Sequence, residues 1–160
     1  MSVFRVSEFR KAGDATGLLE APRGAGSAKG TDAALLGGVV KAPLKILAVD
    51  NEPSITLSLS HIFEGPRYEL TGVESAQAAL AGLDVRRYDV IIVDQKMPQL
   101  TGVELVGEIR KRGVSGKIMV LSAQLSPEVR DAYERMDVHV MLAKPFDVSN
   151  LRSAVERLAA

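Results

Sequence analysis

The sequence contains no cysteine and no tryptophan, and aromatic residues make up only 4% of its 160 residues. Without cysteine the chain can form neither a disulfide framework nor a thiolate metal site or nucleophile. Lysine plus arginine and aspartate plus glutamate both number 20, so the net charge predicts neither a nucleic-acid-binding nor a membrane-binding surface. Apolar stretches are far shorter than the roughly 20 residues of a membrane span, and the amino terminus lacks a secretory signal. We therefore predict a cytoplasmic protein.

Glycine is unevenly distributed along the chain. Seven of the 14 glycines lie in residues 1–43, where apolar residues show little periodicity. Such a segment cannot bury enough apolar surface to offset the entropy lost on ordering it. We predict a flexible tail over residues 1–43, with a short helix near Val3–Lys11, and a folded domain over residues 44–160. The tail segment Gly24–Thr31 resembles a phosphate-binding loop but lacks Gly-Lys-Ser/Thr in register, so we reject that reading.

From Leu44 onward, strand-like and helix-like apolar patterns alternate. Continuous apolar runs predict buried parallel strands at Ile46–Val49, Val90–Val93 and Ile118–Leu121, and more mixed runs predict edge strands at Tyr68–Gly72 and Val138–Leu142. Helical stripes lie between them, at residues 55–63, 76–83, 105–109, 129–136 and 151–158. Helix starts are predicted at Ser75, Ser126 and Asp147. Five such units predict an α/β fold, a doubly wound parallel sheet with helices on both faces.

Polar residues stand at the carboxyl ends of these predicted strands. Asp50 follows the first strand and Asp94 the third, while Ser122 and Lys144 follow the fourth and fifth. In open parallel sheets the ligand site lies beyond the carboxyl ends where strand order reverses, and the first and third strands flank that point. Each residue alone could be a turn, cap or surface residue. Together, two carboxylates, a hydroxyl and a lysine suit a divalent metal and a phosphoryl group.

Four segments carry a resemblance to a known family: ILAVDNEP, YDVIIVDQKMPQLTGVEL, IMVLSA and LAKPF, in this order. Over about residues 44–158 the chain resembles a response-regulator receiver domain (CheY-like) of bacterial two-component signalling, of the stand-alone type. The resemblance implies a flavodoxin-like fold with five parallel strands in the order 2-1-3-4-5 and five helices. It also implies that Asp94 accepts a phosphoryl group from the phosphohistidine of a sensor histidine kinase or a histidine phosphotransfer protein.

The resemblance further implies a Mg²⁺ site made of oxygen ligands. The implied ligands are the side chains of Asp50, Asn51 and Asp94 and the main-chain carbonyl of Lys96. Mg²⁺ keeps several waters, so one or two carboxylates and the incoming phosphate are enough to bind it. A carboxylate attacking a phosphoramidate brings two anions together, and cations must neutralise them.

The remaining roles implied by the resemblance concern phosphoryl binding and signalling. Ser122 would hydrogen-bond the phosphoryl oxygens, and Lys144 would pair with them, with Lys144-Pro145 expected as a cis step. Ser122 and Met141 occupy the positions of the conformational switch. Output would be a contact with a downstream protein through the fourth and fifth strands and helices, from Ser122 to Ala160, and a homodimer is also open. We expect no separate enzyme activity beyond phosphorylation and dephosphorylation of the chain itself.

Two positions depart from the family pattern. The family usually has a second acid where this chain has Asn51, so Asp50, Asp94 and Lys144 carry a net charge of −1 instead of −2. We therefore expect weaker Mg²⁺ binding without its abolition. The family usually has Phe or Tyr where this chain has Met141. A flexible thioether specifies two conformational states poorly, so we expect weaker coupling between phosphorylation and the output surface.

Two other functions remain open. A pseudo-receiver would bind a protein partner without ever being phosphorylated, and Asn51 and Met141 favour it. A flavin carrier or aspartyl phosphatase of similar fold is disfavoured, since such a phosphatase needs an acid where Lys96 stands and no phosphate loop follows the first strand. Lys96 and Gln124 stand at positions that flank the path of the hydrolytic water in the family, so they would tune phosphoryl lifetime. We interpret His61 and His139 as structural residues.

Overall fold

The computed structural model describes residues 4–5 and 41–160. Strands and helices alternate from Leu44 onward, as the apolar patterns predict. The elements are β1 (Phe4–Arg5), β2 (Leu44–Val49), α2 (Pro53–Ile62), β3 (Tyr68–Val73), α3 (Ala76–Val85), β4 (Val90–Asp94), α4 (Gly102–Lys111), β5 (Lys117–Ser122), α5 (Pro127–Arg135), β6 (Val140–Ala143) and α6 (Val148–Ala159). The part of the chain that the structure describes contains no helix long and apolar enough to cross a membrane.

The sheet has the strand order β1-β3-β2-β4-β5-β6. Strands β2 to β6 are parallel, which confirms the predicted order 2-1-3-4-5, and β1 adds an antiparallel strand on β3. The helix predicted near Val3–Lys11 is wrong at Phe4–Arg5, because the outer edge of β3 offers main-chain groups that an extended segment can pair. The predicted flexible tail falls mostly on residues 1–3 and 6–40, outside the described residues, so it stays a prediction.

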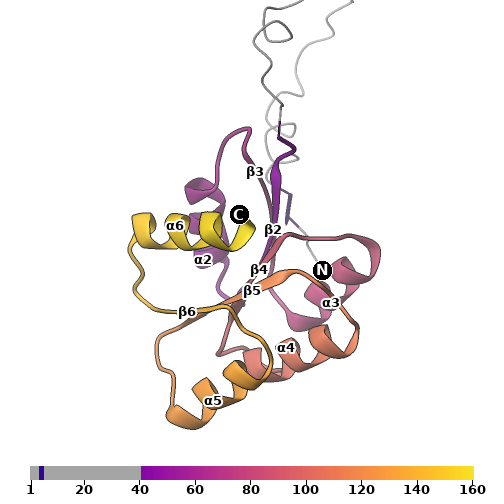
Figure 1. Cartoon of the computed structure of the whole chain (residues 1–160), viewed down its shortest axis with the longest axis vertical. Coiled ribbons are helices and arrows are strands. Elements are labelled where there is room, and N and C mark those ends of the chain that lie inside the picture. Colours follow the sequence, from indigo (N-terminus) through magenta and orange to yellow (C-terminus); the bar gives the residue numbers. More distant parts are fainter. Residues whose placement is uncertain (1–3, 6–40) are drawn as a thin grey trace, which may run out of the picture.

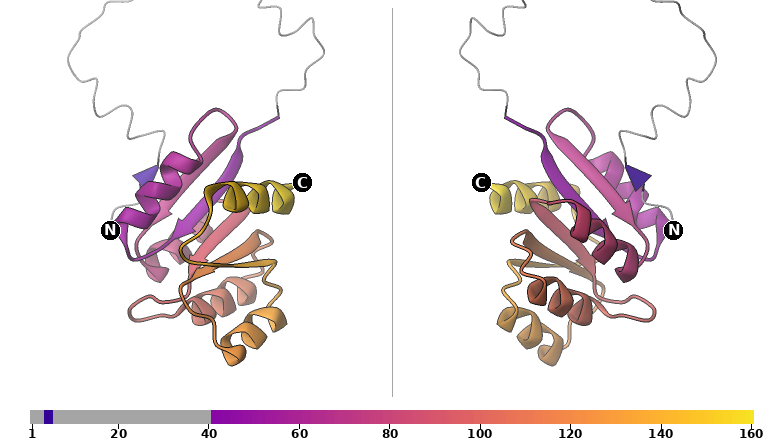
Figure 2. Two further views of the ribbon diagram at one scale, coloured as in Figure 1. Left: turned by 90° about the vertical axis from the view of Figure 1, so that its left-hand side faces the viewer. Right: turned by 90° about the vertical axis from the view of Figure 1, so that its right-hand side faces the viewer.

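Helices cover both faces of the sheet. Figures 1 and 2 show α3, α4 and α5 on one face and α2 and α6 on the other. Alternate residues of each strand point to opposite faces, so Leu47 and Val93 pack into the α3/α4/α5 core while Ile46 and Ile92 pack into the α2/α6 core. Strand β4 is buried along its whole length. This two-sided burial explains the continuous apolar runs in the sequence.

Side chains at the first turn fix where several helices begin. Ser75, Ser126 and Asp147 each accept a main-chain N–H of the first turn of α3, α5 and α6, as predicted. Helix α4 has a reciprocal cap that we did not predict. The Thr101 hydroxyl accepts the N–H of Glu104 at 3.3 Å, and the Glu104 carboxylate accepts the N–H of Thr101 at 2.7 Å. This cap sets the start of α4 close to the end of β4.

The topology also fixes where a ligand site can form. The chain passes from β2 to β3 on one side and then crosses to β4 on the other, so strand order reverses between β2 and β4. These two strands are in register, with Val49 opposite Val93. The residues that follow these two positions, Asp50 and Asp94, therefore lie next to each other at the carboxyl edge of the sheet.

Candidate functional site

Asp50 and Asp94 form an acidic pair at the switch point of the sheet. Both are buried, with 2% and 5% of their surface exposed. Asp50 Oδ1 accepts the N–H of Glu52 at 2.9 Å, which orients this carboxylate at the start of the loop before α2. Asp94 is the last residue of β4, and its carboxylate accepts a main-chain hydrogen bond from Lys96. The two acids that the sequence placed at separate strand ends are thus brought together.

Lys144 lies between the two carboxylates. Its Nζ is 2.8 Å from Asp50 Oδ2 and 3.1 Å from Asp94 Oδ1. The residue follows β6, and its main-chain N–H donates to the carbonyl of Ser122 at 2.9 Å, which ties the last loop to the end of β5. The peptide bond from Lys144 to Pro145 is cis, as predicted. Residues from three different strand ends thus form one charged cluster.

The electrostatics of this cluster favour a bound cation. Burial and the neighbouring charge of Asp50 raise the pKa of Asp94, although Lys144 and the Lys96 main chain act in the opposite direction. Burial alone would lower the pKa of Lys144. Its hydrogen bonds to Asp50 and Asp94 and the negative charges of these two residues outweigh burial and raise the pKa above its usual value. The lysine therefore stays protonated, and one ammonium group does not fully offset two buried carboxylates.

Ser122 lies at the same edge, at the end of β5, and is 4% exposed. Its hydroxyl donates to the carbonyl of Gln124 at 2.7 Å and accepts the N–H of Gln124 at 3.2 Å. The side chain is therefore bonded to its own loop. The Ser122 hydroxyl therefore lies at the same edge of the sheet as the acids, and its hydrogen bonds stay within its own turn.

The donor set around the acids fits Mg²⁺. Asn51 directly follows Asp50 and is exposed, and the main-chain N–H of Lys96 donates to the Asp94 carboxylate. The described residues contain no group of three or more acids or histidines that could hold a metal, so the amide and carbonyl oxygens would have to complete the site. Such oxygens, with two carboxylates and waters, are the ligands that Mg²⁺ uses.

Three more residues singled out from the sequence are Met141, His139 and His61. Met141 is partly buried and packs against the α3/α4/α5 core. His139 Nδ1 accepts the N–H of Ile118 at 3.2 Å, which agrees with a structural role, and His61 is exposed at the end of α2.

Sequence reasoning missed Tyr133 and Gln95. Tyr133 belongs to a helical stripe that we assigned to the core, and it is indeed fully buried on α5. Its hydroxyl, however, donates to Oε1 of Gln95, the residue that follows Asp94. An apolar stripe predicts that a helix face is buried, but it does not predict which group the end of a long side chain contacts.

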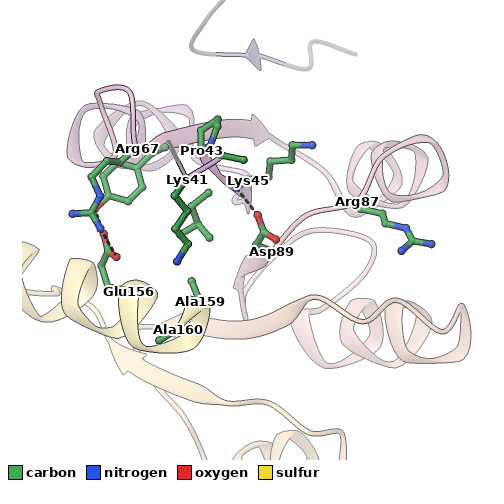
Figure 3. A pocket seen from close by; sticks show the side chains of 12 residues that line it. Lys41, Pro43, Lys45, Arg67, Arg87, Asp89, Glu156, Ala159 and Ala160 are labelled. Carbon is green, nitrogen blue, oxygen red and sulfur yellow. Dashed lines mark hydrogen bonds and ion pairs between the residues drawn. The ribbon is translucent and has the colours of Figure 1, made fainter. Parts of the chain in front are cut away.

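A surface hollow lies at the opposite edge of the sheet (Figure 3). It is lined by residues at the amino ends of β2 and β3 and at the end of α6. Its acids are already engaged: Asp89 accepts the N–H of Lys45 at 2.8 Å, and Glu156 bonds both Arg67 and Tyr68. The hollow is separate from the acid cluster.

Comparisons with known proteins agree with this geometry. A family model for the response regulator receiver domain matches residues 46–156. The chain belongs to this family. The receiver is also similar to the chemotaxis protein CheY4 of Vibrio cholerae, whose solved structure is 33% identical with a TM-score of 0.69, covering 73% of this chain and 99% of that chain.

Curated relatives of the receiver differ in length. Sporulation initiation phosphotransferase F of Bacillus subtilis is 24% identical over 113 residues, which cover 71% of this chain and 91% of that protein. The sensory/regulatory protein RpfC of Xanthomonas campestris pv. campestris is 28% identical over 120 residues, which cover 72% of this chain and only 16% of that protein. The receiver thus matches a small part of RpfC and nearly all of the Bacillus protein.

Proposed function

We propose that Asp94 of this receiver accepts a phosphoryl group from the phosphohistidine of a sensor histidine kinase or a histidine phosphotransfer protein. The observation that supports this most directly is the buried Asp94 carboxylate beside Asp50, with Lys144 3.1 Å away. The name of the Bacillus subtilis relative, a phosphotransferase, points in the same direction. In the proposed step an Asp94 oxygen bonds to phosphorus while the phosphorus–nitrogen bond breaks, and the histidine nitrogen leaves with the electron pair.

The residues of the cluster would divide the work of neutralising charge. Bound Mg²⁺, held by Asp50, Asn51, Asp94 and the main-chain carbonyl of Lys96, would offset the negative charge that develops on the phosphoryl oxygens. Lys144 already donates to both acids, and its ammonium has three N–H groups. It can therefore donate to a phosphoryl oxygen on Asp94 while it keeps its hydrogen bond to Asp50.

Ser122 would complete the phosphoryl site. Its hydroxyl now bonds the main chain of Gln124, and rotation of one side-chain torsion would redirect it toward a phosphoryl oxygen. This exchange replaces one hydrogen bond with a charge-assisted one, which is roughly twice as strong. The receiver would then catalyse only its own phosphorylation and dephosphorylation, with Lys96 and Gln124 tuning phosphoryl lifetime.

Signalling would follow from a change of the surface formed by β5, α5, β6 and α6, which a downstream protein partner would bind. Met141 stands where the switch aromatic is usual, so this change would be coupled to phosphorylation by a smaller free-energy difference. A homodimer and a cytoplasmic location stay predictions.

Phosphorylation can be tested directly by intact mass. The protein is incubated with acetyl phosphate and Mg²⁺, and a phosphoryl adduct is expected in the wild type. The adduct should be absent from Asp94→Asn and present in Asp131→Asn, which removes an exposed carboxylate of α5. A wild type that stays unmodified would refute the proposal.

The alternative is a pseudo-receiver that docks to a partner without being phosphorylated. Asn51 favours it because the second metal-binding acid is lost, and Met141 favours it because the switch ring is lost. An unmodified wild type that binds a partner equally well with Asp94→Asn would support this alternative. The match to the receiver family gives no support to a flavin carrier or phosphatase.

A further inference from the structure

We propose that the buried hydroxyl of Tyr133 is the contact through which phosphorylation of Asp94 is transmitted to helix α5. Tyr133 would act as a positioning residue, because it touches the residue after Asp94 and not the reacting atoms. This inference rests on the proposed phosphorylation of Asp94, and it goes further by naming the contact that carries the signal.

Three elements meet at the Tyr133 hydroxyl. It donates to Gln95 Oε1, in the loop that leaves β4. A Cβ built on Gly102, the first residue of α4, would lie 2.5 Å from the Tyr133 hydroxyl and 2.7 Å from the carbonyl oxygen of Asp94. The end of β4, the start of α4 and the last turn of α5 are therefore in contact at one point. No side chain larger than hydrogen fits between them.

The loop that carries Gln95 is also tied to its neighbours on both sides. The N–H of Gln95 donates to the carbonyl of Leu121 at 3.3 Å, and the N–H of Gly102 donates to the carbonyl of Gln95 at 3.0 Å. A displacement of the main chain at Asp94 therefore moves Gln95 together with the end of β5 and the start of α4. The Gln95 side chain carries that displacement to Tyr133.

Tyr133 cannot adjust to such a displacement on its own. It is fully buried and is the largest fully buried side chain of the described residues. A buried hydroxyl that loses its partner carries a large desolvation cost, so its hydrogen bond tends to be kept. When Gln95 moves, helix α5 therefore either moves with it and keeps the hydrogen bond, or stays in place and loses the bond. These are two distinct conformations of the receiver.

The chemical state of the hydroxyl suits this role. Burial, and then the charge of Asp94, raise the pKa of Tyr133 well above its usual value. The group stays a neutral donor at any physiological pH, and the added charge of a phosphoryl group favours the neutral form further. Its response to phosphorylation is therefore a change of position and not a loss of its proton.

The ring that meets the loop after Asp94 comes from α5. Met141 of β6 and Tyr133 belong to the same core on the α3/α4/α5 face. The helix that carries this ring also forms part of the proposed output surface, so the path from Asp94 to that surface needs only Gln95 and Tyr133.

The test compares the response of α5 to a phosphoryl mimic in matched variants. Amide chemical shifts are recorded before and after addition of beryllofluoride with Mg²⁺, and the acetyl phosphate adduct is measured by mass in the same proteins. Tyr133→Phe removes only the hydroxyl, and Gln95→Met removes only its acceptor. Tyr88→Phe, which removes a hydroxyl from another buried ring of the same core, is the control.

We expect adducts in all four proteins and a similar response near Asp94. In Tyr133→Phe and Gln95→Met the shift changes along α5 should be at most about half as large as in the wild type and Tyr88→Phe. If Tyr133→Phe does not fold, Gln95→Met decides. If Tyr133→Phe and Gln95→Met form the adduct and their α5 response is as large as that of the wild type, this inference alone is overturned. Loss of the adduct in Tyr133→Phe overturns it as well. A wild type without an adduct overturns the proposed function and this inference with it.

Discussion

The ammonium group of Lys144 donates to Asp94 Oδ1 at 3.1 Å, across 50 positions of the chain. This contact does not bring the pKa of Asp94 down to its usual value, because burial and the charge of Asp50 outweigh it. The resting site therefore holds an excess of negative charge that costs stability and attracts a cation.

Removal of the Asp94 charge should stabilise the protein at neutral pH. A carboxyl group whose pKa is raised by folding binds its proton more tightly in the folded state, so its ionisation costs stability above the usual pKa of about 4. In Mg²⁺-free buffer, Asp94→Asn should unfold at higher urea than the wild type at pH 7. Each unit of upward shift is worth about 1.4 kcal/mol.

The same comparison well below pH 4 supplies the control. There Asp94 is protonated in both states, so the advantage of Asp94→Asn should vanish. Asp131→Asn, at an exposed position of α5, should show no such pH-dependent gain. Equal stability of wild type and Asp94→Asn at pH 7 would contradict an excess of negative charge in the resting site.

Asn51→Asp should strengthen Mg²⁺ binding. One added charge about 4 Å from a divalent ion is worth roughly 8 kcal/mol at an effective dielectric near 20, mostly offset by desolvation. We expect a net gain of about tenfold or more in affinity, or about 1.4 kcal/mol. Calorimetric titration with Mg²⁺ measures it directly, and an unchanged affinity would show that Asn51 does not face the metal.

Met141→Tyr should enlarge the conformational response to phosphorylation. A ring specifies two arrangements better than a thioether with several rotamers. Amide shifts on β5, α5, β6 and α6 should change more in this variant than in the wild type on addition of beryllofluoride and Mg²⁺. Met141→Leu, of similar volume and without a ring, should respond as the wild type does. Responses of equal size in all three proteins would count against Met141 as a weak switch.

Gly102 and Gly107 lie on the same helix and should respond to alanine in opposite ways. At Gly102 a Cβ would lie 2.7 Å from the Asp94 carbonyl oxygen and 2.8 Å from Gln95 Cα, both main-chain atoms that cannot move aside. Gly102→Ala should cost about 1–3 kcal/mol by overpacking. At Gly107 the nearest atom is Met136 Sδ at 3.8 Å, so Gly107→Ala should gain up to about 1 kcal/mol from helix propensity. Urea denaturation of the two variants measures both effects.

Arg110 should be sensitive even to lysine. Its guanidinium donates to the main-chain carbonyls of Met136 and Asp137 at the end of α5 and to those of Val114 and Gly116 before β5. A lysine cannot reach four acceptors, so Arg110→Lys should lose about 1–3 kcal/mol of unfolding free energy and the hydrogen-exchange protection of the last turn of α5.

The control for that substitution is Arg112→Lys. Arg112 forms an exposed ion pair with Asp84 at 2.7 Å, which is worth at most about 1 kcal/mol. If both variants lost the same stability, the four carbonyl contacts would not account for the effect.

Much of the fold follows from short stretches of sequence. Apolar runs of strand length are continuous where both faces of the sheet are covered, as at Val90–Val93, and helix caps such as Ser75 act within one turn. Chain order then puts the first and third strands at the switch point, so the meeting of Asp50 and Asp94 could be predicted. The apolar runs and the helix caps are local patterns, and the meeting of the two acids depends only on the strand order.

The tertiary structure decided the direction of individual polar groups. The stripe that contains Tyr133 predicted a buried helix face, and only packing brought its hydroxyl to Gln95. Packing also set the guanidinium of Arg110 against the main-chain carbonyls at the end of α5. Such contacts join segments that no periodicity relates. The sequence by itself therefore determined which residues reach the site edge, while their hydrogen-bond partners depend on how the helices and loops pack.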